Sequence, residues 1–158
     1  MLPAKTISVI LLPCLIAVSF CSCNQAFSEY TINNADTSAQ ITGPSDKVEL
    51  VYFHRPNRCE ACTYAEERVS YLVNTYFQDE TDSGKLTFTI YNIGDKESAP
   101  AAERYGAIGS QLFVNSIING KDYIRYVDEI WYWGCIDNEE VFDATVKEII
   151  AKALYGEK

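Results

Sequence analysis

The spacing of apolar side chains changes several times along this 158-residue chain, and each change marks the boundary of an expected element. Residues 48–53 form a nearly continuous apolar run, which is typical of a central strand covered on both faces. Apolar residues at three- and four-residue spacings then predict an amphipathic helix from 63 to about 77. Its expected buried stripe is Cys62, Ala65, Val69, Leu72, Val73 and Tyr76, and its expected outer face carries Glu66, Glu67 and Arg68.

The second half of the chain repeats this alternation. Residues 86–93 alternate and predict a second strand, and residues 98–105 predict a short helix that Gly106 closes. Two further strand patterns, 112–118 and 123–127, flank Asn119-Gly120, which predicts a hairpin because both central positions of such a turn need a positive φ. A final helix is expected to begin within 137–140, and its buried stripe would be Val141, Phe142, Val146, Ile149, Ile150 and Ala153. The order β-α-β-α-β-β-α predicts an α/β domain over 47–158.

The first 46 residues carry different patterns. Residues 1–23 combine Lys5 with an apolar run over 7–20 that Pro13 interrupts, which favours an export signal over a spanning helix. Residues 20–23 resemble the end of a bacterial lipoprotein signal, which implies Cys23 as the lipidated residue. Ordinary cleavage and an uncleaved anchor are the alternatives, and each places the domain outside the cytoplasm, anchored in the cell envelope or secreted. Residues 24–46 are polar and show no period, which predicts a linker.

Composition narrows the function classes. A hydrophobic content of 47% is enough to build a folded core. The formal charge of −9 argues against nucleic acid or anionic lipid headgroups as partners. We expect a monomer without a cofactor, which meets a membrane only through an N-terminal lipid or signal anchor.

The candidate chemistry is concentrated in Cys59-Glu60-Ala61-Cys62, between the first strand and the first helix. The unsatisfied N–H groups and the positive end of the helix dipole stabilise a thiolate on Cys59. Cys62 lies one turn later, close enough to attack a mixed disulfide formed at Cys59. The spacing therefore predicts thiol–disulfide exchange with a protein or small-thiol disulfide, and the partner sets the direction of electron flow.

Over residues 47–155 the chain resembles the thioredoxin-like family. The resemblance rests on Cys59 and Cys62, on the element order, and on residues 105–109 (Tyr-Gly-Ala-Ile-Gly), which are similar to the family's Tyr-Gly-Ile-x-Gly segment. It implies a four-stranded mixed sheet with helices on both faces, Cys59 as the exposed nucleophile and Cys62 as the resolving thiol. With Phe53-His54 before the motif, the body also looks like a thioredoxin-like group often encoded near arsenic-handling genes.

The segment before the third strand departs from the family's pattern. Thioredoxins carry a cis-proline just after the position of Gly109, whereas Ser110 and Gln111 follow it here. Because a non-proline cis bond costs roughly 2.5–4 kcal/mol, we expect a trans peptide at this point. The family's proline also discourages metal binding at the thiols, so its absence leaves metal binding open. Gln111 is therefore a candidate auxiliary residue.

Charged groups around the motif also depart from the pattern. The family's buried acidic residue has no match after Glu49 in the first strand, and the nearest titrating group is His54. His54 is interpreted either as a proton acceptor near the thiolate or as a strand-end side chain bonded to backbone or water. Glu60 disfavours a thiolate on Cys59, whereas Arg58 on its other side favours one.

Cys135 is a third thiol in the body of the chain. It is interpreted either as a buried packing residue or as a further redox or ligand thiol near the pair. In the second case, Cys135, Cys59, Cys62 and His54 would form a Cys₃His set for zinc or another soft metal. Two alternatives to exchange therefore stay open: a thiol-based module that binds zinc or trivalent arsenic, and a redox-inert interaction domain of the same fold.

Overall fold

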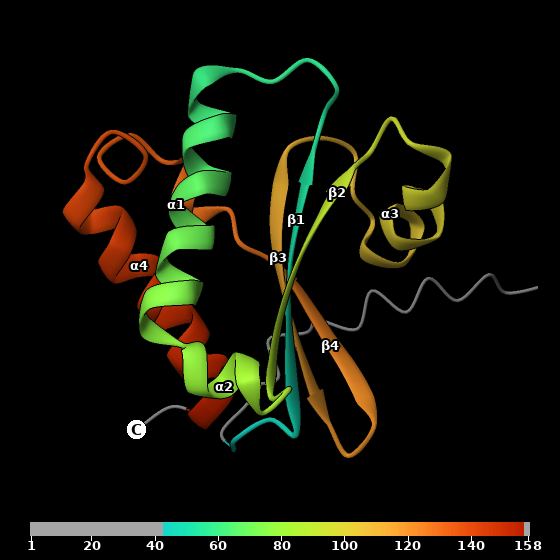
Figure 1. Cartoon of the computed structure of the whole chain (residues 1–158), viewed down its shortest axis with the longest axis vertical. Coiled ribbons are helices and arrows are strands. Elements are labelled where there is room, and N and C mark those ends of the chain that lie inside the picture. Colours follow the sequence, from blue (N-terminus) through green and yellow to red (C-terminus); the bar gives the residue numbers. More distant parts are fainter. Residues whose placement is uncertain (1–42, 157–158) are drawn as a thin grey trace, which may run out of the picture. The chain divides into compact units, whose positions relative to one another are not determined.

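The computed structural model describes residues 43–156, and its centre is a four-stranded mixed sheet (Figure 1). The strand order is β2-β1-β3-β4, with β1 and β2 parallel and β3 antiparallel to both β1 and β4. The sheet expected from the sequence is therefore confirmed. The strands are β1 (Lys47–His54), β2 (Leu86–Asn92), β3 (Gln111–Ile118) and β4 (Lys121–Tyr126).

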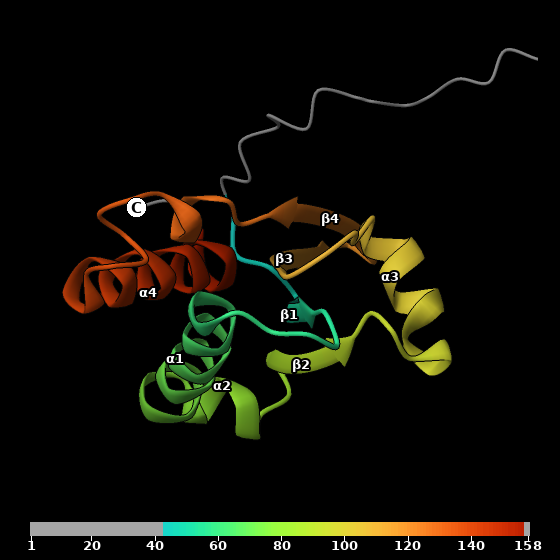
Figure 2. The ribbon, with the colours of Figure 1, turned by 90° about the horizontal axis from the view of Figure 1, so that it is seen from above.

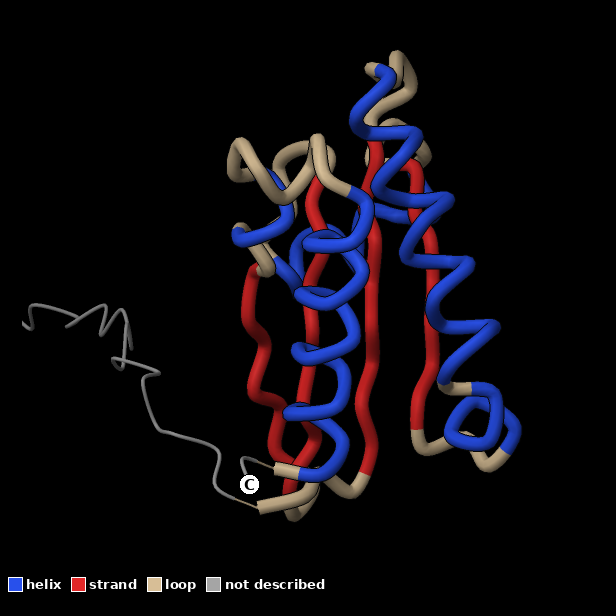
Figure 3. The backbone as a smooth tube through the Cα atoms, turned by 90° about the vertical axis from the view of Figure 1, so that its left-hand side faces the viewer, coloured by secondary structure: helices blue, strands red, loops and turns tan. Residues whose placement is uncertain are grey.

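Helices cover both faces of this sheet, as expected. Figure 2 shows α1 and α4 on one side and α3 on the other, and Figure 3 shows the two long helices in front of the strands. The helices are α1 (Glu60–Tyr76), α2 (Gln78–Asp82), α3 (Ala99–Tyr105) and α4 (Glu139–Tyr155), with short 3₁₀ turns η1 (Lys96–Ser98) and η2 (Glu129–Trp131).

Strand β1 is apolar on both sides because it lies between two cores. Its alternate residues Val48, Leu50 and Tyr52 join the larger core, which α1 and α4 cover. Val51 and Phe53 point to the opposite face, into a smaller core beside α3. The smaller core is rich in aromatic rings and comprises Val51, Phe53, Tyr105, Ala107 and Phe113.

The two turns expected to need positive φ have it. Asn119 and Gly120 connect β3 to β4 with φ of 52° and 72°, which confirms the predicted hairpin. Gly106 ends α3 with a φ of 66°, and its N–H donates to the Glu103 carbonyl. This cap directs the chain from α3 back towards β3.

Some sequence expectations for the long helices were wrong. Tyr76 is 53% exposed instead of buried, and its ring packs under the Lys147 ammonium at 4.5 Å, outside the core. Val141 is likewise exposed, whereas its neighbour Phe142 in the same turn of α4 is fully buried. Arg68 was expected on an outer face, but it lies between the two helices and makes two hydrogen bonds to Asp143 of α4. Helix α1 also begins earlier than expected, directly after Cys59.

A network of polar side chains crosses the sheet on the α3 face, and we call it the sheet network. Asn115, fully buried on β3, donates to the carboxylates of Glu49 and Asp122 and accepts from the Tyr123 backbone N–H. The Tyr105 hydroxyl donates to Glu49 at 2.9 Å. The network thereby joins α3 to three strands. Its members are Glu49, Arg104, Tyr105, Asn115 and Asp122.

The described chain begins with a few residues of the predicted linker. Ser45 is buried and donates to the Ala153 carbonyl of α4 at 2.6 Å. Asp46 accepts from the Asn119 backbone N–H at 2.7 Å, so these two residues pack against the domain. Residues 1–42, with Cys23 and the export segment, lie outside the described part. Between residues 43 and 156, the helices are too short or too polar to cross a bilayer.

Candidate active site

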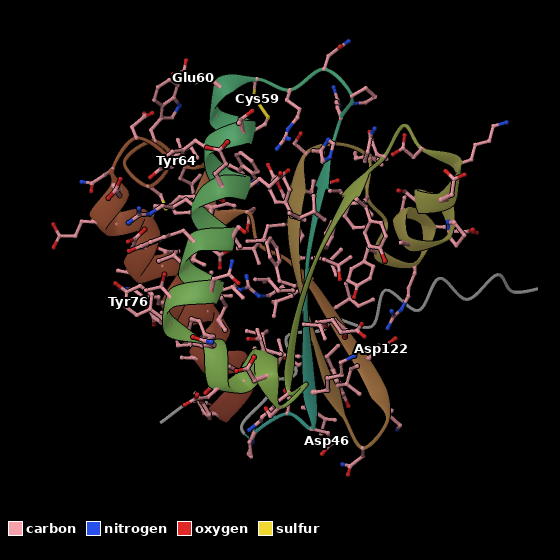
Figure 4. All side chains as sticks on the ribbon, viewed as in Figure 1. Asp46, Cys59, Glu60, Tyr64, Tyr76 and Asp122 are labelled. Atoms are coloured by element: carbon pink, nitrogen blue, oxygen red, sulfur yellow. A yellow bond between two sulfur atoms is a disulfide. The ribbon has the colours of Figure 1, made fainter. Side chains whose placement is uncertain are left out.

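The candidate site lies where β1 delivers the chain to the first turn of α1. Cys59 is exposed and serves as the N-cap of the helix, and Figure 4 shows it with Glu60 at that end of α1. Cys59 and Cys62 form a disulfide, with their Cα atoms 5.1 Å apart. The two residues that the sequence singled out are therefore brought together by the helix start.

The backbone of the first helical turn faces the Cys59 sulfur. The Cys62 backbone N–H donates to Cys59 Sγ at 3.2 Å, and both the N–H and the hydroxyl of Thr63 donate to the Cys59 carbonyl. When the disulfide is reduced, a negative charge on Cys59 Sγ would face a helix N-terminus and an N–H donor. Both stabilise a thiolate and make the sulfur a better nucleophile at neutral pH.

Tyr52 supports this turn from the sheet. Its ring is fully buried on β1, and its hydroxyl donates to the Cys62 carbonyl at 2.8 Å. Burial raises the pKa of Tyr52 far above its usual range, and the negative charge of Glu66 raises it further. The hydroxyl therefore stays protonated and keeps its hydrogen bond to the turn that carries both sulfurs.

An ion pair joins the loop before Cys59 to the helix after Cys62. The Arg58 guanidinium contacts the Glu66 carboxylate, and the two side chains are only 28% and 14% exposed. The expectation that Glu66 lies on the outer face of the helix was wrong, because its carboxylate turns inward to meet Arg58. Tyr52 bonds to the Cys62 carbonyl, one helical turn before Glu66, so these three residues support the same turn of α1. We call Tyr52, Arg58 and Glu66 the disulfide cluster.

His54 is the last residue of β1, and its ring contacts the backbone instead of a thiol. Its ring Nδ1 lies 3.0 Å from the Arg55 carbonyl oxygen, a contact that requires a proton on Nδ1 because a carbonyl only accepts. The structure therefore places His54 as a strand-end side chain bonded to the local backbone.

The loop of residues 55–58 packs against two neighbouring loops. The Arg55 guanidinium lies against the backbone of Gly109, where an added Cβ would come within 3.1 Å of it, and it donates to the Ile108 carbonyl at 3.5 Å. Pro56 lies against Gly94 so closely that a side chain there would collide with it. These close approaches hold the segment before Cys59 in place.

Gln111 shapes the loop that takes the place of the family's proline segment. Its side-chain oxygen accepts from the backbone N–H groups of Ile108 and Gly109, at 2.7 and 3.2 Å. Gln111 pairs with Phe53 near the C-terminal end of β1, so this loop lies at the same end of the strands as the disulfide. The peptide bonds of residues 43–156 are all trans, which confirms the expectation for this position. Ile108, at the tip of the loop, is 81% exposed.

Cys135 lies away from the pair. It is a buried free thiol in the larger core, and its sulfur lies 3.8 Å from the Thr145 hydroxyl oxygen of α4. Within residues 43–156, no three His, Cys, Asp or Glu side chains are arranged to hold a metal ion. The structure therefore does not assemble the Cys₃His set, and Cys135 packs as an ordinary core residue.

Sequence reasoning did not identify Tyr52 and Glu66 as site residues. The spacing of Glu66 carried a signal, because it follows Cys62 by four residues and precedes Val69 by three, which places it on the inward face. Tyr52 carried a weaker signal, since an aromatic residue in an apolar strand is consistent with simple packing.

Neither a family model nor a curated protein matches the sequence. Among solved structures, the chain is similar to the solution structure of a thioredoxin from Thermus thermophilus, with 15% identity and a TM-score of 0.42 over 68% of this chain and 76% of that chain. The fold is thioredoxin-like by its own element order, strand order and strand directions.

Proposed function

We propose that the protein is a thiol–disulfide oxidoreductase that works outside the cytoplasm through Cys59 and Cys62. The observation that carries this proposal is the disulfide at an exposed helix N-cap, where the Cys62 N–H already points at the Cys59 sulfur. A disulfide that served only as a structural crosslink would not need Cys59 to be exposed. A crosslink that closes so few residues also stabilises the folded state little.

The exchange has two steps. In the first, the Cys59 thiolate attacks one sulfur of a partner disulfide, a mixed disulfide forms, and the partner's other sulfur leaves as a thiolate. In the second, Cys62 loses its proton and attacks the Cys59 sulfur. The Cys59–Cys62 disulfide forms and the partner's remaining sulfur leaves, so that two electrons have passed to the partner. The reverse sequence oxidises a partner dithiol.

The export signal expected in residues 1–23 supports the location. A domain released from the membrane, or held there by a lipid on Cys23, would meet oxidised partners. Its partners would be disulfides of proteins or small thiols. The acidic composition supports a partner other than nucleic acid.

Insulin reduction in the presence of dithiothreitol tests the proposal. We expect the wild-type protein to accelerate the reaction and Cys59→Ser to abolish the acceleration. Cys62→Ser should accumulate a mixed disulfide that mass spectrometry detects, because the second step is blocked. Cys135→Ser, a matched change of a buried thiol, should retain activity. Full activity in Cys59→Ser would contradict the proposal.

The zinc or trivalent arsenic module is the competing interpretation. A tetrahedral zinc site needs four ligands, and the described residues bring only the two thiols together. Elemental analysis of anaerobically purified protein and the thermal shift caused by arsenite distinguish the two functions. A strong arsenite shift without insulin reduction would favour the metalloid module.

A further inference from the structure

The Arg58–Glu66 ion pair differs from an ordinary surface ion pair because its two residues lie on either side of the Cys59–Cys62 segment. Arg58 directly precedes Cys59, and Glu66 lies on α1 one turn after Cys62. The contact therefore spans the segment that holds both sulfurs. Residues four apart on a helix lie on the same face, so the Glu66 side chain is on the same face of α1 as Cys62.

The pair is also shielded from solvent. Both side chains are largely covered, and the buried Tyr52 bonds to the Cys62 carbonyl one helical turn before Glu66. Water screens charges less in such a place than at an open surface, so each charge acts more strongly on its neighbours. Arg58 is thus the cation that directly precedes the reactive cysteine in the chain, and its guanidinium is already paired with a carboxylate.

Reduction of the disulfide changes the balance of charge around Arg58. The oxidised site holds one anion close to the guanidinium, the Glu66 carboxylate. In the reduced site the Cys59 thiolate becomes a second anion, attached to the neighbouring residue. One guanidinium cannot fully neutralise both, so each anion weakens the stabilisation that the other receives.

We propose that Glu66 is a positioning residue that holds Arg58 beside the dithiol and limits how strongly Arg58 stabilises the Cys59 thiolate. The inference rests on the proposed exchange function and specifies how the reactivity of its nucleophile is set. Other groups act on the same site: Glu60 of α1, Tyr52 of β1, and His54 and Arg55 before the motif.

The proposal predicts opposite effects for the two partners. Glu66→Gln keeps the size of the side chain and removes its charge. The Cys59 thiolate then no longer competes with a carboxylate for the positive charge of Arg58. The pH at which Cys59 becomes reactive should fall, and its alkylation at mildly acidic pH should become faster. Arg58→Gln should raise that pH and slow alkylation. We expect changes of about two- to tenfold, since one pKa unit corresponds to a tenfold change in thiolate fraction.

The experiment measures the rate at which iodoacetamide alkylates Cys59 in the reduced full chain as a function of pH. Tandem mass spectrometry locates the label within the peptide that carries both Cys59 and Cys62, and so separates the two thiols. Glu67→Gln is the matched control, because it removes the same charge from an exposed neighbouring position of the same helix. The double variant Arg58→Gln/Glu66→Gln tests whether Glu66 acts through Arg58, in which case the Glu66→Gln effect shrinks in that background.

The outcomes separate the proposal from its competitors. Equal shifts in Glu66→Gln and Glu67→Gln would show a general charge effect and overturn it. An unchanged Glu66→Gln effect in the Arg58→Gln background would show direct repulsion and overturn it as well. If Glu66→Gln does not fold, the loop variant Arg58→Gln decides, because no shift there contradicts the proposal. Failure of the exchange function is recognised separately, by insulin reduction that persists in Cys59→Ser.

Discussion

The two faces of the sheet carry two polar clusters, which differ in the number of polar partners that their carboxylates have. In the sheet network, the one side chain of Asn115 makes hydrogen bonds to Glu49, Asp122 and the Tyr123 N–H. Arg104 forms ion pairs with the Glu49 and Asp122 carboxylates. In the disulfide cluster, the Glu66 carboxylate meets one guanidinium, that of Arg58. Figure 4 shows Asp122 on β4 well away from Cys59 at the start of α1.

This difference separates a structural cluster from a reactive one. A buried polar network whose members are all bonded fixes one arrangement of the elements, and removing a member leaves other members unpaired. A cluster held by one ion pair beside a redox group can respond when the charge of that group changes. We therefore expect changes in the sheet network to act on stability and changes in the disulfide cluster to act on thiol chemistry.

The largest expected effect on stability comes from Asn115. Replacing it with Ala would remove the fully buried amide that donates to the Glu49 and Asp122 carboxylates and accepts from the Tyr123 N–H. We expect the free energy of unfolding to fall by about 3 kcal/mol, measured by urea denaturation of the oxidised protein. Glu66→Gln should change it by less than about 1 kcal/mol, since the glutamine oxygen can still accept a hydrogen bond from Arg58. A reversed order would contradict the division between the clusters.

The second prediction concerns acid stability. Hydrogen bonds from Asn115 and Arg104 lower the pKa of Asp122 below its ordinary 3.8. Burial raises the pKa of Glu49, but its hydrogen bonds and Arg104 outweigh burial and bring it below 4.5. Carboxyls with lowered folded-state pKa values stabilise the fold above their unfolded values, and this stabilisation is lost as pH falls through the folded values.

The melting temperature should therefore fall between about pH 5 and pH 2, and the fall should be smaller in a variant without one of these carboxyls. Glu49→Gln is the direct test, monitored by circular dichroism across that range. Glu97→Gln removes an exposed carboxyl that lies outside the sheet network, and it serves as the control. An identical acid profile for wild type and Glu49→Gln would show that the network does not govern acid stability.

The hydrophobic pattern predicted most of the fold because period and burial follow from the same geometry. Strand β1 alternates between two apolar cores, which explains its continuous apolar run, and the Asn119-Gly120 turn followed from its φ requirement. Long side chains limited the prediction. The pattern placed Glu66 outside and treated Tyr52 as plain packing, because it cannot show which distant partner a polar tip will reach.

The candidate site shows the same division between local and long-range information. The pairing of Cys59 and Cys62 at a helix start depended on adjacent residues and could be expected from them. The position of Cys135 depended on how η2 and α4 pack against the sheet, so both of its interpretations had to stay open until the fold was known. The role of the Gln111 side chain likewise required the geometry of a loop that the sequence only outlined.

A third prediction tests how the sheet supports the disulfide. Tyr52→Phe removes only the hydroxyl that donates to the Cys62 carbonyl. We expect a loss of about 1 kcal/mol in the free energy of unfolding, because the ring still fills the core while the carbonyl loses one hydrogen bond. Leu50→Val, a change on the same strand and the same face, is the control for packing alone. The Tyr52→Phe variant should also show altered kinetics of disulfide reduction by dithiothreitol, which Leu50→Val should leave unchanged.

The smallest effect is expected at Gln111, where the changed groups are near solvent. Gln111→Ala would release the backbone N–H groups of Ile108 and Gly109, at a cost of about 0.5–1 kcal/mol in the free energy of unfolding. Gln111→Glu keeps an oxygen acceptor at the same place and should restore both the hydrogen bonds and most of the stability. Ile108 is exposed at the end of the strands where the disulfide lies, so the freed loop should raise the KM for insulin in Gln111→Ala. The pH dependence of Cys59 alkylation should stay unchanged. A shift in that pH dependence would show instead that the loop acts on the sulfur itself.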